Sequence, residues 1–271
     1  MAELIRKSED TEYRSMSDDV ILEVRHLNSF YENEDDSFLM HPGNDTQQVL
    51  HDVSFEMHRG DILGLAGESG SGKTTLARVL LGIVKDYNGE VIHHTSYPQM
   101  VFQDPFSSLN PARTIRWILE EPLKALAKRS REDWIPRTKS DRLEAVRQML
   151  ASVGLDEEYL DRKPRALSGG QRQRVSIACA AITRPSLIIA DEPVSALDVT
   201  IQAQILELLK QLKETFSLSY LFISHDLNVI YQICNKVMVM QYGRIVESGE
   251  TKKVFRHPEH PYTQALFMDA L

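Results

Sequence analysis

Apolar and polar positions repeat with two different periods along this chain. Residues 20–27 and 49–57 alternate at every second position, which predicts two strands, and the polar segment 32–48 predicts a hairpin connection between them. Short continuous apolar runs, typical of strands buried in a parallel sheet, occur at residues 62–66, 187–190 and 220–223. Helical periods follow these runs. We therefore expect an α/β fold, with a mostly parallel sheet and an antiparallel β subdomain laid before it.

The middle of the chain predicts a helical subdomain at about residues 104–165. Before it, residues 90–95 and 99–103 predict further strands, and Pro105 and Pro111 exclude a continuous helix just after them, which places Gln103 at the mouth of a loop. From residue 114 to 153 the period is helical and Gly154 is a C-terminal stop. The apolar positions of its last helix are Leu143, Val146, Leu150 and Val153. We expect Pro122 and Pro136 to divide this region into separate helices.

Length and composition favour one soluble domain. The 271 residues can bury a large core, so we expect a domain at 20–271 preceded by a loosely held polar tail at 1–19. No apolar run approaches the ~18 residues that span a bilayer, and the polar start does not match a signal peptide, which predicts a cytoplasmic chain. The net charge of −8 argues against nucleic-acid binding. Cys179 and Cys234 have no metal or redox spacing and are interpreted as core thiols.

The most specific motif follows the apolar run at residues 62–66. Gly67, Gly72, Lys73 and Thr74 have the Walker A spacing, in which a glycine-rich loop and a helix N-terminus turn backbone N–H groups toward phosphate. In such a loop Lys73 reaches the β- and γ-phosphates of a nucleotide, and the Thr74 hydroxyl ligates Mg²⁺. The alternative is a glycine-rich turn that matches by chance. A strand before the motif and a helix after it favour the phosphate site.

A second glycine-rich turn precedes another apolar strand. Ser168 to Gln171 leads directly into a helical pattern, so its glycines and free N–H groups could hold an anion, although small polar turns also serve as ordinary helix caps. The strand at 187–190 then ends in Asp191 and Glu192, a Walker B pattern. Carboxylates at the C-terminal end of a parallel strand beside a P-loop are placed to hold Mg²⁺ and to polarise water.

Three further residues have both a structural and a functional interpretation. Asp198 lies in a turn before an amphipathic helix and could be only its N-cap. His225 follows the strand at 220–223, and a histidine there is usually structural, but here it shares a sheet edge with the P-loop and Asp191. Tyr31, beside Phe30, offers an aromatic face on which adenine could stack, or is an ordinary half-buried aromatic residue.

With these motifs in this order, the chain resembles the ATP-binding subunits of ABC transporters from about residue 21 to 271. By that resemblance Tyr31 matches the A-loop aromatic, Gln103 the Q-loop, and His225 the switch histidine. The resemblance assigns nucleotide contacts to Gly67, Ser69, Gly70, Ser71, Gly72, Lys73, Thr74 and Thr75 of Walker A, to Ser168, Gly169, Gly170 and Gln171 of the signature motif, and to Asp198 of the D-loop. It implies a P-loop NTPase core with ATP and Mg²⁺ as cofactors.

The same resemblance implies a mechanism and partners. Glu192 would be the general base, Gln103 and His225 would sense the γ-phosphate, and Thr74, Gln103 and Asp191 would hold Mg²⁺. The signature motif would face the P-loop of a second ATPase subunit, identical or paralogous, so that ATP closes a dimer. Membrane permease subunits, and indirectly an extracytoplasmic solute-binding protein, would complete a transporter, with this chain peripheral at the cytoplasmic face of the membrane.

Other segments point to a subfamily. The segments that resemble importers of oligopeptides, dipeptides, nickel or metal chelates are Gln103-Asp104-Pro105, Ser108-Leu109-Asn110-Pro111, Glu121-Pro122-Leu123 and His257-Pro258-Glu259-His260-Pro261-Tyr262-Thr263-Gln264-Ala265-Leu266. This C-terminal segment covers about residues 250–271. A soluble assembly such as carbon–phosphorus lyase stays open as an alternative. A DNA-repair ATPase is disfavoured because the 93 residues from Thr74 to Leu167 (167 − 74) carry no heptads, and a non-hydrolysing regulator is disfavoured by Glu192.

Overall fold

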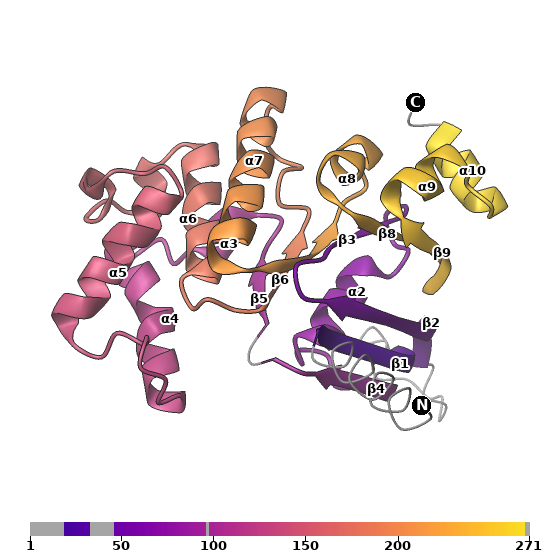
Figure 1. Ribbon diagram of the computed structural model, residues 1–271, viewed down its shortest axis with the longest axis horizontal. Coiled ribbons are helices and arrows are strands. Elements are labelled where there is room, and N and C mark those ends of the chain that lie inside the picture. Colours follow the sequence, from indigo (N-terminus) through magenta and orange to yellow (C-terminus); the bar gives the residue numbers. More distant parts are fainter. Residues whose placement is uncertain (1–18, 33–45, 96–97, 269–271) are drawn as a thin grey trace, which may run out of the picture.

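The computed structural model describes residues 19–32, 46–95 and 98–268, and Figure 1 shows two sheets with helices around them. The predicted N-terminal tail falls almost wholly outside these residues. The three-stranded sheet is antiparallel, in the order β2 (Thr46–His58), β1 (Val20–Glu32), β4 (Tyr87–His93). The six-stranded sheet has the order β5 (Gln99–Val101), β6 (Leu187–Asp191), β7 (Ser219–Ile223), β3 (Ile62–Ala66), β8 (Lys236–Gln241), β9 (Arg244–Glu250).

The large sheet is parallel except at one edge. Strands β5 to β8 run in one direction, and only β9 is antiparallel, because it follows β8 through the tight turn at Tyr242 and Gly243. Every residue of β3, β6 and β7 is buried, as continuous apolar runs predict for strands covered on both faces. The predicted α/β fold, the mostly parallel sheet and the separate antiparallel sheet are confirmed.

Seven α-helices and two 3₁₀ turns lie among the described residues before the last two helices. They are α2 (Lys73–Leu80), α3 (Pro105–Ser108), α4 (Ile115–Arg129), α5 (Lys139–Ser152), η1 (Glu157–Tyr159), η2 (Pro164–Ala166), α6 (Gly169–Ala181), α7 (Val199–Phe216) and α8 (Leu227–Ile233), followed by α9 (Thr251–Arg256) and α10 (Pro261–Met268). None of the helices in the described ranges is both long and apolar enough to cross a membrane.

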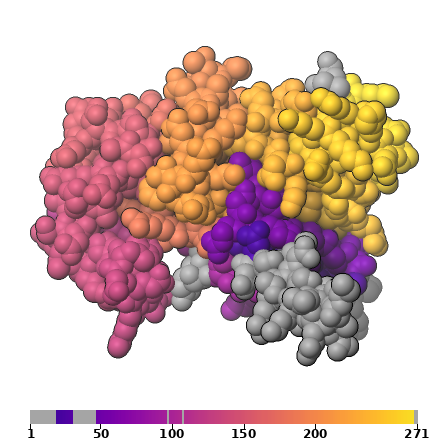
Figure 2. Space-filling model, in the orientation of Figure 1, coloured from indigo at the N-terminus to yellow at the C-terminus, as the bar shows by residue number. Residues whose placement is uncertain are grey.

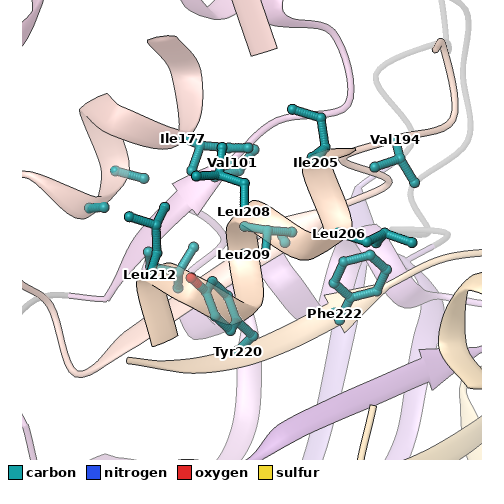
Figure 3. Packing of buried hydrophobic residues seen from close by; sticks show 14 of the residues in the cluster. Val101, Ile177, Val194, Ile205, Leu206, Leu208, Leu209, Leu212, Tyr220 and Phe222 are labelled. Atoms are coloured by element: carbon teal, nitrogen blue, oxygen red, sulfur yellow. The ribbon is translucent and has the colours of Figure 1, made fainter. Parts of the chain in front are cut away.

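The larger hydrophobic core lies between the sheet and helices α6 and α7. Figure 3 shows Leu209 and Leu212 of α7 packed toward Tyr220 and Phe222 of β7, all of them buried. Burying such side chains contributes roughly 1.5–3 kcal/mol each. A second core joins the antiparallel sheet to the other face of the large sheet through Leu76 and Leu80 of α2. The helix that follows Gly72 is thus fixed between both sheets.

The helical region confirms most of its predicted features. Thr114 caps α4, Val153 ends α5, and Gly154 has the left-handed φ of 69° that suits a C-terminal stop. Val146 and Leu150 are buried on the predicted face. The elements between residues 105 and 166 are all helical, and in Figure 1 α4 and α5 lie at one end of the molecule, opposite the antiparallel sheet. The boundary of a helical subdomain stays a prediction.

The expectation that Pro122 breaks this region was wrong. Pro122 lies inside α4, which runs unbroken from Ile115 to Arg129. Proline removes only the hydrogen bond to the carbonyl four residues earlier, here that of Ile118. The thiol of Cys179 lies 4.0 Å from this carbonyl oxygen and partly replaces the missing donor. Pro136, by contrast, does lie between α4 and α5, as predicted.

Three strand and loop boundaries also differ from the prediction. β1 continues to Glu32 and β2 begins at Thr46, because polar residues of the two strands still pair in register, including Tyr31 with Gln47. β4 ends at His93 and β5 at Val101, so both finish earlier than expected, and Gln103 lies in the loop. Pro105 starts the short helix α3, for which Asp104 is the N-cap, since proline is well tolerated in a first turn.

Candidate active site

The topology brings three strand ends to one edge of the large sheet. β6, β7 and β3 are parallel neighbours, and their C-terminal ends lead to Asp191 and Glu192, to His225, and to the loop 67–72. Residues far apart in the sequence therefore meet beside the N-terminus of α2. In open α/β sheets this is the edge at which ligands bind. Figure 2 shows, on one face, a purple region from the earlier part of the described chain between the orange and yellow later parts.

The loop 67–72 takes a backbone course that requires glycine. Gly67 has a φ of 148°, and a Cβ there would collide with the carbonyl oxygen of Met240. Gly72 is the N-cap of α2 with a φ of 109°, and it has no side chain to occupy the first N–H groups of that helix. Those N–H groups and the positive end of the helix dipole are thus available to an anion.

Lys73 is buried beneath this loop. Its ammonium group donates hydrogen bonds to the carbonyl oxygens of Gly67, at 2.8 Å, and Glu68, at 2.7 Å. Burial lowers the pKa of Lys73, and the nearby carboxylates of Glu192 and Asp191 act in the opposite direction. A buried cation beside free helix N–H groups gives the site a positive potential where phosphate oxygens would lie.

Glu192 is the centre of a small polar cluster at the end of β6. Its carboxylate accepts a hydrogen bond from Nε2 of Gln103 at 2.8 Å, and its other oxygen lies 2.8 Å from Nδ1 of His225. Its backbone has the left-handed φ of 46°, held by a hydrogen bond from its N–H to the carbonyl of Ile223. A non-glycine residue in this conformation is strained, and strain of this kind is concentrated at functional sites.

Asp191, the residue before Glu192, contacts Thr74 of α2. The Thr74 hydroxyl donates to Oδ2 of Asp191 at 3.2 Å. Burial raises the pKa of Asp191, the bond from Thr74 counteracts it, and the neighbouring charge of Glu192 adds to it. A carboxylate and a hydroxyl at one point fit Mg²⁺, which takes oxygen ligands and commonly needs only one or two from protein beside phosphates and water. Gln103, the third predicted ligand, instead contacts Glu192 here.

A cleft of about 620 Å³ is lined by most of these groups, though not by Asp191. It is lined by Val49, Gly67, Glu68, Ser69, Gly70, Gly72, Lys73, Thr74, Thr75, Gln103, Glu192, His225 and Leu266. The structure thus brings together most of the predicted Walker A residues with the three predicted catalytic residues. Ser71 lies within the loop, where its backbone carbonyl accepts from the N–H of Gly243 at 2.8 Å.

The second glycine-rich turn is not part of this cleft. Ser168 and Gln171 form a reciprocal capping box at the start of α6, with their mutual hydrogen bonds at 3.3 and 2.9 Å. A Cβ on Gly170 would lie 2.8 Å from Cγ2 of Ile201 in α7, and Gly169 faces Leu197. Asp198 caps α7 by accepting from the N–H of Ile201 at 3.0 Å, so its structural interpretation is confirmed. Nucleotide contacts by these five residues stay predictions.

Sequence reasoning missed several groups at this site. Val49 and Leu266 line the cleft, and the hydroxyl of Tyr262 accepts a hydrogen bond from the backbone N–H of Glu68 at 3.1 Å. Nothing local in the sequence links Tyr262 to a loop 194 positions away. Tyr31 lies in β1, but its side chain lies outside the described residues, so adenine stacking on it stays a prediction.

Both cysteines have the buried character expected of core thiols. Cys234 is buried and Cys179 is partly buried, and both are free thiols. Burial raises the pKa of the Cys179 thiol to about 11 and that of Cys234 still further. Both groups are therefore protonated and unreactive at neutral pH.

Known proteins resemble this chain in sequence and in structure. The family described as ABC transporter matches residues 50–195. The dipeptide transport ATP-binding protein DppF of Haemophilus influenzae is 44% identical over 237 residues, which cover 81% of this chain and 70% of that protein. The oligopeptide transport ATP-binding protein AppF of Bacillus subtilis is 40% identical over 264 residues, covering 92% and 77%. The dimeric ATP-binding cassette MJ0796 with bound ADP and Pi aligns with a TM-score of 0.69 and 26% identity, covering 85% and 99%.

Proposed function

The chain belongs to the ABC transporter family, and on that premise we propose that its ATPase activity powers the import of peptides across a membrane. Support for the class of solute comes from the relatives, which are named as dipeptide and oligopeptide transport ATP-binding proteins. A nickel or chelate importer has no such support among the relatives described above. Peptides are therefore the solute that we propose.

One observation supports the catalytic assignment: Glu192 is held from two sides at the mouth of the P-loop cleft. Gln103 and His225 each contact one of its carboxylate oxygens at 2.8 Å, so both position the group that accepts a proton from the attacking water. Lys73 and the free N–H groups of α2 hold the phosphates. Thr74 and Asp191 would hold Mg²⁺, which supplies positive charge to the phosphate oxygens in the transition state.

We propose that the signature turn completes the site of a second ATPase subunit. Ser168, Gly169, Gly170, Gln171 and Asp198 belong to helix N-termini outside this chain's own cleft. A helix N-terminus attracts phosphate, and a partner chain packed face to face would bring its own P-loop opposite this turn. ATP would then hold the two subunits together, and hydrolysis would release them. Copurification of a tagged with an untagged copy of this chain distinguishes an identical partner from a paralogous one.

A groove between the start of β5 and α4 is the proposed contact with membrane permease subunits. It has a volume of about 480 Å³ and is lined by Leu81 just after α2, by Gln99 of β5 and by Pro122, Ala125 and Leu126 of α4. Gln99 lies in β5, the strand that leads directly to Gln103. A partner segment in this groove would therefore sense movement of the helical region relative to the site. We place the chain peripherally, on the cytoplasmic face of the membrane.

Coexpression with peptide permease subunits tests this proposal. The wild-type chain should sediment with membranes and hydrolyse ATP faster when a peptide-loaded solute-binding protein is added. Ala125→Arg places a charge in the groove and should lower the membrane-bound fraction, whereas Ala151→Arg, at an exposed position of α5, should not. Copurification with a cytosolic enzyme assembly instead of membranes would favour the carbon–phosphorus lyase type of ATPase.

A further inference from the structure

The last described helix returns to the P-loop. Tyr262 and Leu266 lie four residues apart on α10 and so share one face of it. The Tyr262 hydroxyl accepts a hydrogen bond from the backbone N–H of Glu68 at 3.1 Å, and Leu266 lines the same cleft as Lys73 and Glu192. One face of α10 is therefore part of the wall of the nucleotide site.

Buried contacts fix α10 in this position. Glu247 of β9 accepts hydrogen bonds from the N–H groups of Glu259, at 2.9 Å, and His260, at 3.0 Å, just before the helix begins. On the inner face, Phe267 is buried and stacks on Phe255 of α9 with ring centroids 4.3 Å apart. Thr263 is also fully buried. The helix is thus a rigid support and not a loosely attached end.

Tyr262 restrains a peptide unit that Lys73 also contacts. The carbonyl oxygen of Gly67 accepts from the Lys73 ammonium at 2.8 Å, and the N–H of Glu68, in the same peptide unit, donates to Tyr262. Glu68 directly follows Gly67, whose unusual φ starts the loop. Without the Tyr262 hydroxyl, this N–H would lose its partner and the first turn of the loop would have one fewer restraint.

The cleft lining has a polar and an apolar part. Among its described lining residues only Val49 and Leu266 have aliphatic side chains, and the others are glycines, hydroxyl residues or charged and amide groups. The phosphates of a nucleotide suit the polar part, beside Lys73 and Thr74. An aliphatic surface suits the nucleoside, whose base is the least polar part of the ligand.

We propose that α10 is a wall of the ATP site in which Tyr262 is a positioning residue for the P-loop and Leu266 contacts the nucleoside. This proposal rests on the function proposed above for the cleft. Tyr262 acts on phosphate binding through Glu68, because its hydroxyl contacts that residue and it is not among the described residues that line the cleft. Leu266 acts on the nucleoside, which ATP has and tripolyphosphate lacks. The two side chains therefore have separable effects.

Binding of MgATP and of magnesium tripolyphosphate to the isolated full chain separates the two roles. Tyr262→Phe should weaken both ligands by about 3- to 10-fold, because the P-loop serves both. Leu266→Ala should weaken ATP by a similar factor and leave tripolyphosphate unchanged, because only ATP carries a nucleoside. Tyr231→Phe is the matched control: Tyr231 lies 5.1 Å from the ring of Phe255 in the same aromatic cluster, and the substitution also removes one phenol hydroxyl.

Each alternative result has a definite meaning. The proposal is overturned if Tyr262→Phe binds both ligands as Tyr231→Phe does, or if Leu266→Ala leaves ATP affinity unchanged or weakens both ligands equally. Lys73→Ala separates this failure from failure of the site itself. If Lys73→Ala weakens ATP but the α10 variants behave like the control, the cleft is correct and α10 has no role. If Lys73→Ala has no effect, the assignment of the cleft is wrong.

Discussion

The chain contains two glycine-rich turns that lead into helices, and their local structures are opposite. At the P-loop, the N-cap of α2 is Gly72, which has no side chain to occupy the first N–H groups. At the signature turn, the N-cap of α6 is Ser168, whose hydroxyl accepts from the N–H of Gln171, while the Gln171 side chain accepts from the N–H of Ser168. The first turn leaves its donors free, and the second satisfies two of them internally.

The surroundings of the two turns also favour the P-loop as the phosphate site. The P-loop follows a fully buried strand, and Lys73 lies buried beneath it with two carboxylates nearby. The signature turn follows the 3₁₀ turn η2 and packs against Leu197 and Ile201. A helix N-terminus alone is thus a weak indication of a phosphate site. Free donors, a buried cation and a neighbouring carboxylate cluster are the features by which we propose that the P-loop, and not the signature turn, binds this chain's own nucleotide.

The largest expected effect concerns chemistry at the P-loop side. Glu192→Gln keeps the shape of the side chain and its contact with Gln103 but removes the basic oxygen, so turnover should fall ~10²–10⁴-fold while ATP binding is retained. Steady-state ATPase and equilibrium ATP binding measure the two quantities. Glu214→Gln, at an exposed position of α7, is the control. Near-normal turnover in Glu192→Gln would show that Glu192 is not the base.

The next effect concerns affinity. Lys73→Ala removes the buried cation that contacts Gly67 and Glu68, and it should weaken ATP binding by about 10- to 100-fold, because hydrogen bonds to charged groups contribute roughly 1.5–3 kcal/mol. Isothermal titration calorimetry on the isolated chain measures this change. Unchanged affinity would show that the buried cation of the P-loop does not distinguish this turn from the signature turn in ATP binding.

A third prediction concerns the opposite end of β3. Asp61 is buried and accepts hydrogen bonds from the side chains of Asn235 and Lys236 and from the backbone N–H of His58, each at 3.0 Å. Asp61→Asn should lower the free energy of unfolding by about 1–3 kcal/mol, because one amide oxygen cannot replace two carboxylate oxygens. ATP affinity should change little, since the cleft lies at the other end of the strand. Urea unfolding and ATP titration test both parts.

Asp61 also predicts a dependence of stability on pH. Burial alone would raise its pKa, but hydrogen bonds from Asn235, Lys236 and His58 together lower it. A carboxyl whose pKa is lower in the folded chain stabilises the fold above its unfolded pKa, and this stability is lost as the pH falls through the folded value. The contribution should therefore disappear at acidic pH, and Asp61→Asn should lack it. Equal acid dependence in both proteins would contradict this account.

The smallest effect compares two capping boxes. Ser168→Ala and Thr138→Ala each remove an N-cap hydroxyl from such a box, at α6 and α5, and each should cost about 0.5–2 kcal/mol of stability. Only Ser168→Ala should also reduce steady-state ATPase, by a few-fold, because only this turn is proposed to face a partner's ATP. If both variants reduce ATPase equally, the signature turn has no role beyond capping.

The sequence predicted the parts of the fold in which local pattern and tertiary packing agree. The buried strands β3, β6 and β7 are continuous apolar runs, and their parallel order brings Gly67, Asp191 and His225 to one edge as expected. Pro122 could not be predicted in the same way, because the carbonyl of Ile118 that it leaves without a backbone donor is contacted by the thiol of Cys179. That contact comes from another helix.

The site could likewise be predicted only where the spacing of a motif by itself determines how its residues are arranged. The spacing of the P-loop residues fixes their relative positions, so most of them were found in the cleft. The contact between Tyr262 and Glu68 joins residues 194 positions apart, and predicting it requires knowing how all strands of the sheet are arranged. The capping box of Ser168 and Gln171 could be expected from a serine three residues before a glutamine, but its distance from the cleft could not.

ATP binding by the isolated Ser168→Arg chain tests the central claim most directly. The claim is that this chain's own ATP is held by the P-loop and not by the signature turn. Circular dichroism first confirms that the variant is folded, and calorimetry then measures its affinity for MgATP. We predict wild-type affinity, because residue 168 lies outside the cleft lining. Loss of ATP binding by the folded Ser168→Arg chain would contradict the claim and place the signature turn in this chain's own site.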